Sequence, residues 1–250
     1  MKLEDLTAYL DGYLRIREVS DYPGSLNGLQ VGNSGSVNRL GVAVDACQAT
    51  IEAAVALDAD LLLVHHGLFW DGLQPLAGVR WRRFAPLFSH DVAVYSAHLP
   101  LDLHPEVGNN AVLARRLGLR DLDWFGDDHG NLLGAAGTLD ITREELVARV
   151  AKTLAVEPHV IPAGGDRVHR VGVITGGGGS MIPQAVEAGL DAYITGEGQH
   201  HTHFYAEEHG INVIFAGHYA TETVGVKALA EHLQERFGLA WEFIDHPTGL

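Results

Sequence analysis

Five side chains of types that commonly bind metals each follow a predicted β-strand: His65, His66, Asp102, His218 and Glu222. Ligands bind at the carboxyl ends of strands in open α/β sheets, and imidazoles with carboxylates suit divalent Zn, Mn, Fe, Co or Ni. Adjacent His65 and His66 are expected to point to opposite sides of a strand, so they would serve two metals more readily than one. Glu222 has two oxygens that could bridge those metals. The pattern predicts a site for two divalent metal ions; the alternative is that His65 and His66 only hydrogen-bond to backbone.

Two further residues could take part in hydrolysis beside these ligands. A His-x-x-x-Asp/Glu spacing begins at His98 and again at His218. His98 is therefore a candidate to donate a proton or to orient a ligand. Glu197 corresponds to His66 in an internal repeat and is a candidate general base. Two metals lower the pKa of a coordinated water, so hydrolysis would need no serine or cysteine nucleophile.

A sheet must bring these strand ends together. Buried strands are predicted at Leu40–Val44, Leu61–Val64 and Val92–Ser96, with helices at Leu3–Leu14 and Ala49–Leu57. The helices are recognised by apolar residues that recur on one face. Because strands alternate with helices, a mostly parallel sheet is expected.

The chain contains an internal repeat. A shift of 131 positions aligns Arg39–Gly67 with Arg170–Gly198 without a gap, and a shift of 120 aligns Val92–His98 with Asn212–His218. We therefore expect an α/β fold with two related lobes, approximately residues 1–125 and 126–250, and the metal site between them. Residues 126–170 should add strands and a helix that begins with the capping box Thr142–Glu145.

Two segments near the candidate ligands have more than one interpretation. The glycine run within Thr175–Ser180, which includes Gly176–Gly179, could offer backbone amides to an anion such as phosphate, or it could be a plain flexible turn. His200, His201 and His203 could approach the site as proton carriers, or they could lie on the first turn of a surface helix.

Composition limits the classes of partner. The chain has 17 Lys+Arg and 32 Asp+Glu, a formal net charge of −15, which argues against generic binding to nucleic acid or anionic membranes. Arg80, Arg82 and Arg83 form the basic cluster that a nucleic-acid interaction would use; otherwise they are a solvated patch. No apolar run approaches the ~20 residues that span a bilayer. Cys47 is the single cysteine, which excludes an intramolecular disulfide and leaves packing or a reactive thiol as its role. We expect a soluble, cytoplasmic protein.

The chain resembles the Nif-three-like dinuclear-metal family, many of whose members are named homologues of a type-two GTP cyclohydrolase I. The motifs that carry the resemblance are Asn27–Val31, Leu63–Gly67, Ala97–Asp102, Thr195–Glu197 and Gly217–Glu222. The resemblance implies two related lobes, a dinuclear site between them and a toroidal homohexamer. It also implies that His66 and Asp102 hold one metal, that His65 and His218 hold the other, and that Glu222 bridges both. The chain lacks the domain that longer members insert between the halves.

Two functions from different classes are consistent with these residues. The first is a metal-dependent hydrolase that acts on GTP or another purine nucleotide, or on a phosphoester. The second is a non-catalytic scaffold that stores or delivers metal or has a regulatory role. Structural zinc sites tend to be closed by four ligands and rich in thiolate. Five ligands without thiolate for two metals leave positions open, which favours the hydrolase.

Overall fold

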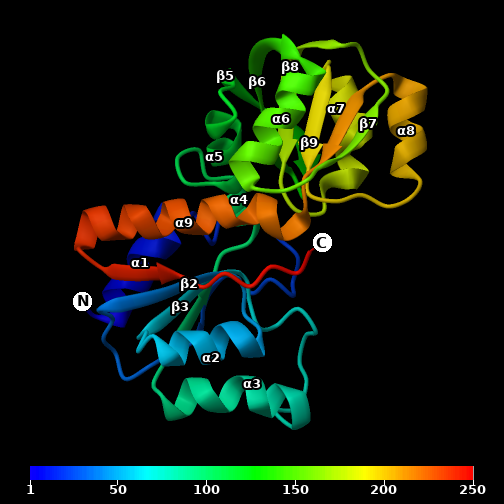
Figure 1. Cartoon of the computed structure of the whole chain (residues 1–250). Coiled ribbons are helices and arrows are strands. Elements are labelled where there is room, and N and C mark those ends of the chain that lie inside the picture. The colour runs from blue at the N-terminus through cyan, green and yellow to red at the C-terminus, as the bar shows by residue number, and fades with distance from the viewer. Residues whose placement is uncertain (250) are drawn as a thin grey trace. The chain divides into compact units, whose positions relative to one another are not determined.

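The computed structural model describes residues 1–249 and has an α/β architecture with two mixed β-sheets (Figure 1). One unit comprises residues 1–101 and 226–246, and the other comprises residues 102–225 together with residues 247–249. Residues 102–125 belong to the second unit because the helix Asn109–Arg116 contacts strands of the second sheet and the strand Arg120–Asp128 is part of that sheet. Residues 226–246 return to the first unit, whose sheet contains the strand Ala240–Phe243. Among the described residues, none of the helices combines the length and apolar character that crossing a membrane requires.

The first unit contains a five-stranded sheet with the order β1-β4-β3-β2-β11. The strands are β1 (Gly28–Val31), β2 (Arg39–Asp45), β3 (Leu61–His66), β4 (Ala93–Ser96) and β11 (Ala240–Phe243). All neighbours are parallel except β1 and β4. The helices are α1 (Leu3–Tyr13), α2 (Gln48–Ala56), α3 (Gly78–Ser89) and the part of α9 (His218–Phe237) from Val226 onward.

Helices cover both faces of this first sheet. Ile51 and Ala54 of α2 and Phe84 and Leu87 of α3 pack in one core with Val64 of β3. The other face is covered by α1 and the second half of α9 (Figure 1). Because both faces are covered, Leu61–Val64 is almost fully buried, as expected for a central parallel strand.

The second unit contains a six-stranded sheet with the order β5-β6-β8-β9-β10-β7. The strands are β5 (Arg120–Asp128), β6 (Asn131–Thr142), β7 (His159–Pro162), β8 (Arg167–Ile174), β9 (Ala192–Thr195) and β10 (Asn212–Phe215). The parallel strands are β8, β9 and β10, whereas β5, β6 and β7 pair in antiparallel fashion. The expectation of a mostly parallel sheet is therefore confirmed for the first sheet and wrong for the second, which gains a hairpin and an edge strand from residues 120–162.

The second unit also contains several helices. They are α5 (Asn109–Arg116), α6 (Arg143–Leu154), the 3-10 turn η1 (Gly178–Met181), α7 (Ile182–Glu187), α8 (Thr202–His209) and the first part of α9, while α4 (Leu99–Asp102) lies at the boundary of the units. Helix α6 begins with the expected capping box: the Glu145 amide donates to Thr142 Oγ1 at 3.1 Å, and the Thr142 amide donates to Glu145 Oε2 at 2.8 Å.

The sequence repeat corresponds to the same order of elements in each unit. Strand β2 aligns with β8, and helix α2 aligns with η1 and α7 taken together. Strands β3 and β4 align with β9 and β10, respectively. In both sheets the three strands are parallel neighbours, with β3 or β9 in the middle. Candidate site residues follow the carboxyl ends of these strands in each unit.

Candidate metal centre

His65 and His66 end the central strand of the first sheet, and each is hydrogen-bonded toward a different neighbouring strand. His65 Nδ1 donates to the Ala97 carbonyl after β4 at 2.9 Å, and His66 Nδ1 donates to Asp45 Oδ1 at the end of β2 at 2.9 Å. The ring centroids are nevertheless 4.6 Å apart. The expectation that the rings point to opposite sides is wrong, because hydrogen bonds to the residues of two neighbouring strands orient the rings.

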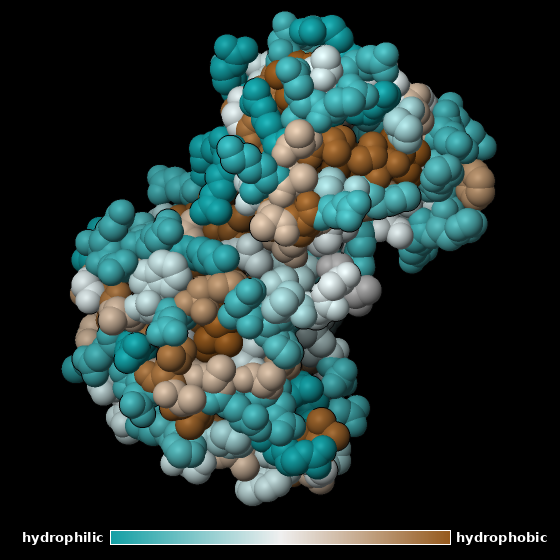
Figure 2. Space-filling model, viewed as in Figure 1, coloured by the Kyte–Doolittle hydropathy of each residue, from teal (hydrophilic) through white to brown (hydrophobic). Residues whose placement is uncertain are grey.

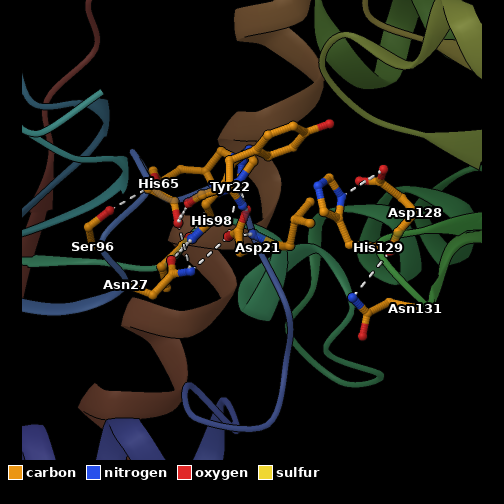
Figure 3. A network of polar contacts seen from close by, with 12 residues as sticks. Asp21, Tyr22, Asn27, His65, Ser96, His98, Asp128, His129 and Asn131 are labelled. Atoms are coloured by element: carbon orange, nitrogen blue, oxygen red, sulfur yellow. Dashed lines mark hydrogen bonds and ion pairs between the residues drawn. The ribbon is translucent and has the colours of Figure 1, made fainter. Parts of the chain in front are cut away.

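His98 follows β4 and is held by a buried carboxylate in the first unit (Figure 3). Its Nδ1 donates to Asp21 Oδ1 at 2.9 Å, while its backbone amide donates to Asn27 Oδ1 at 2.7 Å. Asn27 Nδ2 in turn donates to Asp21 Oδ2 at 2.7 Å. Burial would raise the pKa of Asp21, but the hydrogen bond and charge of His98 and the hydrogen bond from Asn27 outweigh it and leave this pKa below its ordinary value.

The three imidazoles of the first unit form one group. His65, His66 and His98 each have a ring nitrogen within 4.8 Å of the corresponding nitrogens of the other two. Two partly exposed aromatic residues flank the group: Trp70 lies edge-on to His98 with ring centroids 4.9 Å apart, and Tyr22 lies 6.1 Å from it. The three imidazoles can therefore offer nitrogen ligands to a metal next to the aromatic rings of Trp70 and Tyr22.

His218 and Glu222 lie one turn apart at the start of α9 in the second unit. His218 Nε2 is 3.3 Å from Glu222 Oε2, and His218 Nδ1 donates to Glu197 Oε1 at 2.9 Å. The hydrogen bond to Glu222 raises the pKa of His218 to about 9, against the effect of burial, and the charges of Glu222 and Glu197 add to this. A divalent metal would displace the Nε2 proton, so binding through His218 is coupled to proton release.

Asp102 is buried in the second unit and is positioned by residues that the sequence reasoning did not identify. Asn109 Nδ2 donates to Asp102 Oδ1 at 2.8 Å, and the Thr175 hydroxyl lies 3.4 Å from the same oxygen. Asn110, also fully buried, accepts from the Thr175 amide at 2.8 Å. The available signal was a pair of asparagines directly before the apolar residues Ala111–Ala114 of the same helix, where buried polar groups need specific partners.

The first residue of the glycine run, Gly176, packs tightly against a candidate ligand. A Cβ on Gly176, whose φ is +66°, would lie 2.1 Å from Glu222 Oε1. The Gly176 amide donates to Thr221 Oγ1 at 3.0 Å, and the Gly179 amide donates to the Glu197 carbonyl at 3.0 Å. These two amides are engaged within the protein and do not point to an anion, and the close approach at Gly176 makes room for the Glu222 carboxylate.

Comparison with known proteins decides the family. The model of the Duf34/NIF3 family (NGG1p interacting factor 3) matches residues 1–248. The chain belongs to this family. A relative from Deinococcus radiodurans named GTP cyclohydrolase 1 type 2 homolog is 43% identical over 249 residues, which cover 99% of this chain and 94% of that protein. One of the same name from Archaeoglobus fulgidus is 40% identical over the full length of both. A crystal structure from Thermus thermophilus covers both chains completely, with 44% identity and a TM-score of 0.92.

The resemblance drawn from five motifs is thus confirmed, and the hydrogen bonding of this Duf34/NIF3 chain tests whether its residues fit a metal. His65, His66, His98 and His218 each donate through Nδ1 to an oxygen acceptor. In a neutral imidazole this leaves the lone pair on Nε2, and metal-binding histidines characteristically donate their other ring N–H in this way. The donor set therefore fits divalent metal ions in each unit.

The histidine-rich segment lies on the surface of this Duf34/NIF3 chain. His200 and His201 are exposed, and half-buried His203 pairs with Glu207 on α8 with a distance of 3.2 Å between Nε2 and Oε1. His203 thus lies in the first turn of a surface helix, whereas His200 and His201 lie in the exposed turn that precedes α8. Cys47 is half-buried, and its amide donates to Thr50 Oγ1 at 3.0 Å where α2 begins.

One histidine outside the candidate site is also buried. His104 is 9% exposed, and its Nδ1 accepts from the amides of Glu106 and Val107, each at 3.3 Å. Its Nδ1 is thus an acceptor, whereas Nδ1 is a donor in the four candidate imidazoles. This difference in tautomer separates a histidine that shapes a loop from those suited to bind metal through Nε2.

Proposed function

We propose that this Duf34/NIF3 protein is a metal-dependent hydrolase that uses two divalent metal ions. His65, His66, Asp102, His218 and Glu222 are the proposed ligands: His66 and Asp102 for one metal, His65 and His218 for the other, and Glu222 for both. The observation that carries the proposal is that each candidate imidazole donates through Nδ1 to an oxygen. When bound, the metals would supply Lewis acidity and lower the pKa of a coordinated water.

The remaining polar residues are proposed to position the ligands and move protons. Glu197 and Asp45 hold the Nδ1 protons of His218 and His66. We therefore assign Glu197 to positioning His218 rather than to acting as the general base. Asp21 accepts the hydrogen bond from His98 Nδ1 and so orients this ring, whose Nε2 could then exchange a proton with a leaving group.

The proposed substrate is a purine nucleotide, with a phosphoester as the second possibility. Support for the nucleotide comes from full-length relatives named GTP cyclohydrolase 1 type 2 homolog. Support for catalysis over a closed structural site comes from the ligand set, which contains no thiolate and has few ligands per metal. We also propose that the chain assembles as a toroidal homohexamer, which analytical ultracentrifugation can test.

The test begins with metal content per chain in protein purified without chelator or nickel affinity, measured by inductively coupled plasma mass spectrometry. The same sample is then assayed with GTP and with simple phosphoesters. Two metals per chain, with turnover that disappears in Glu222→Ala, would support the hydrolase. Two metals without turnover of any of these substrates would favour the metal-binding scaffold, and no metal after reconstitution would reject both functions.

A further inference from the structure

A cavity of about 560 Å³ lies in the second unit beside the first turn of α8. It is bounded by the ends of β7 and β10 and by the turn that follows β9. Figure 2 shows apolar surface in this unit between α8 and the neighbouring strands, surrounded by hydrophilic residues. The volume is within the range of about 300–1,000 Å³ that is typical of small-molecule sites.

Aromatic and imidazole rings line this cavity on two sides. His159 of β7 and Phe215 of β10 are direct cross-strand partners, and their rings are nearly parallel, with an interplanar angle of 12° and centroids 6.1 Å apart. On α8, Phe204 is 49% exposed and meets the rings of His200 and His203 edge-on. Such ring faces provide stacking surfaces for a planar heteroaromatic ligand.

One wall of the cavity connects it to a candidate metal ligand of the same unit. Glu197 lines the cavity and accepts the hydrogen bond from His218 Nδ1 at 2.9 Å. A smaller cavity of about 340 Å³ shares Glu197, Gly198 and Gln199 and is also lined by Ser180 and His201. A ligand that stacks in the larger cavity could therefore extend hydroxyl or phosphate groups over the 197–199 turn toward these side chains.

We propose that the larger cavity binds the base of a purine nucleotide through stacking on Phe204 and on the His159–Phe215 pair. The inference rests on the proposed function, since it names the subsite that holds the substrate's ring near His218. Stacking on ring faces does not distinguish one base from another. The cavity would therefore contribute affinity for the nucleotide and would orient its base relative to Glu197.

The test is isothermal titration of the protein, as purified with its metals, with GTP and with guanosine. Removing one stacking partner typically weakens binding by about tenfold, so Phe204→Ala should bind both ligands about tenfold more weakly than the wild type. Phe204→Trp should retain binding because it keeps a ring face. The matched control is Tyr205→Ala, which removes an exposed aromatic side chain from the next position of α8, outside both cavities.

The outcomes separate this subsite from the hydrolase. GTP binding that weakens in Phe204→Ala but not in Tyr205→Ala supports the subsite even when no turnover is detected. Turnover of GTP with unchanged binding in Phe204→Ala overturns the subsite and leaves the hydrolase standing. Absence of binding by both ligands up to millimolar concentration also overturns the subsite, while metal content reports on the metal centre independently.

Discussion

Replacing Gly176 by alanine should displace Glu222 and remove metal. A Cβ at this position would lie 2.1 Å from Glu222 Oε1 and 3.3 Å from His218 Nε2. The distance to the carboxylate oxygen is far shorter than a van der Waals contact. Glu222 is 3% exposed, so its carboxylate has little room to retreat without leaving its position beside His218. Since Glu222 is the proposed bridging ligand, we expect Gly176→Ala to retain at most one metal per chain.

Two other glycines serve as controls that separate the cost of backbone strain from the cost of the contact with Glu222. The left-handed backbone costs about 1–2 kcal/mol for a residue with a Cβ, and Gly189, at φ +69°, has no atom within 4 Å of such a Cβ. Gly189→Ala should therefore lower the free energy of unfolding by about that amount and leave metal content unchanged. At Gly177, where φ is −81°, the nearest contacts of a Cβ would be 3.9 Å away, so Gly177→Ala should be close to neutral.

The assay combines urea denaturation in the presence of chelator with metal analysis of the same preparations. Gly176→Ala should lose more stability than Gly189→Ala, because it adds the contact with Glu222 to the same backbone strain. It should also be the variant of the three that loses metal. If Gly176→Ala binds as much metal as Gly177→Ala, the assignment of Glu222 as a bridging ligand held in place by the turn is refuted.

Four further predictions concern individual side chains. Glu222→Ala should retain at most one metal per chain, whereas His200→Ala should retain both, as measured by mass spectrometry. Equal metal content in the two variants and the wild type would reject bridging by Glu222. His98→Ala should reduce turnover and keep near wild-type metal, whereas loss of metal would make His98 a ligand. Glu197→Gln weakens the hydrogen bond to His218 Nδ1 and should reduce metal affinity by about 10–100-fold in a chelator competition, and unchanged affinity would argue against its positioning role. Because the pKa of Asp21 is below its ordinary value of 3.8, its carboxylate stabilises the fold above that value and loses this contribution as the pH falls through the folded-state pKa. Asp21→Asn should therefore be less stable than the wild type at pH 7, with a difference that shrinks on acidification in urea denaturation, and a constant difference would contradict this.

The elements that carry the candidate ligands could be predicted because their signals are local. Leu61–Val64 is a continuous apolar run, and such runs between helices indicate buried parallel strands. The repeat located the corresponding strand β9 and the start of α9 without any knowledge of packing. Antiparallel strands β5, β6 and β7 were not foreseen in detail, because pairing between distant segments leaves only a weak pattern in the sequence.

The partners of the ligands could not be predicted because they come from distant parts of the chain. Thr175 and Asp102 are 73 positions apart, and Asp21, which orients His98, is 77 positions away from it. Nothing in the local sequence distinguishes Asp21 from other acidic residues in loops. The ring geometry of His65 and His66 was also missed, since strand alternation says nothing about tethers to neighbouring strands.

The position of β11 has a consequence for synthesis of the chain. Strand β2 is paired on one side with β3 and on the other with β11, which comes from the last part of the chain. While the chain emerges from the ribosome, the edge of β2 stays open until nearly every residue of the second unit has been made. Open strand edges of this kind attract other chains. The first unit begins to be translated before the second but completes its sheet after it. A nascent chain stalled before Ala240 would leave the edge of β2 exposed, where it could pair with another chain and aggregate.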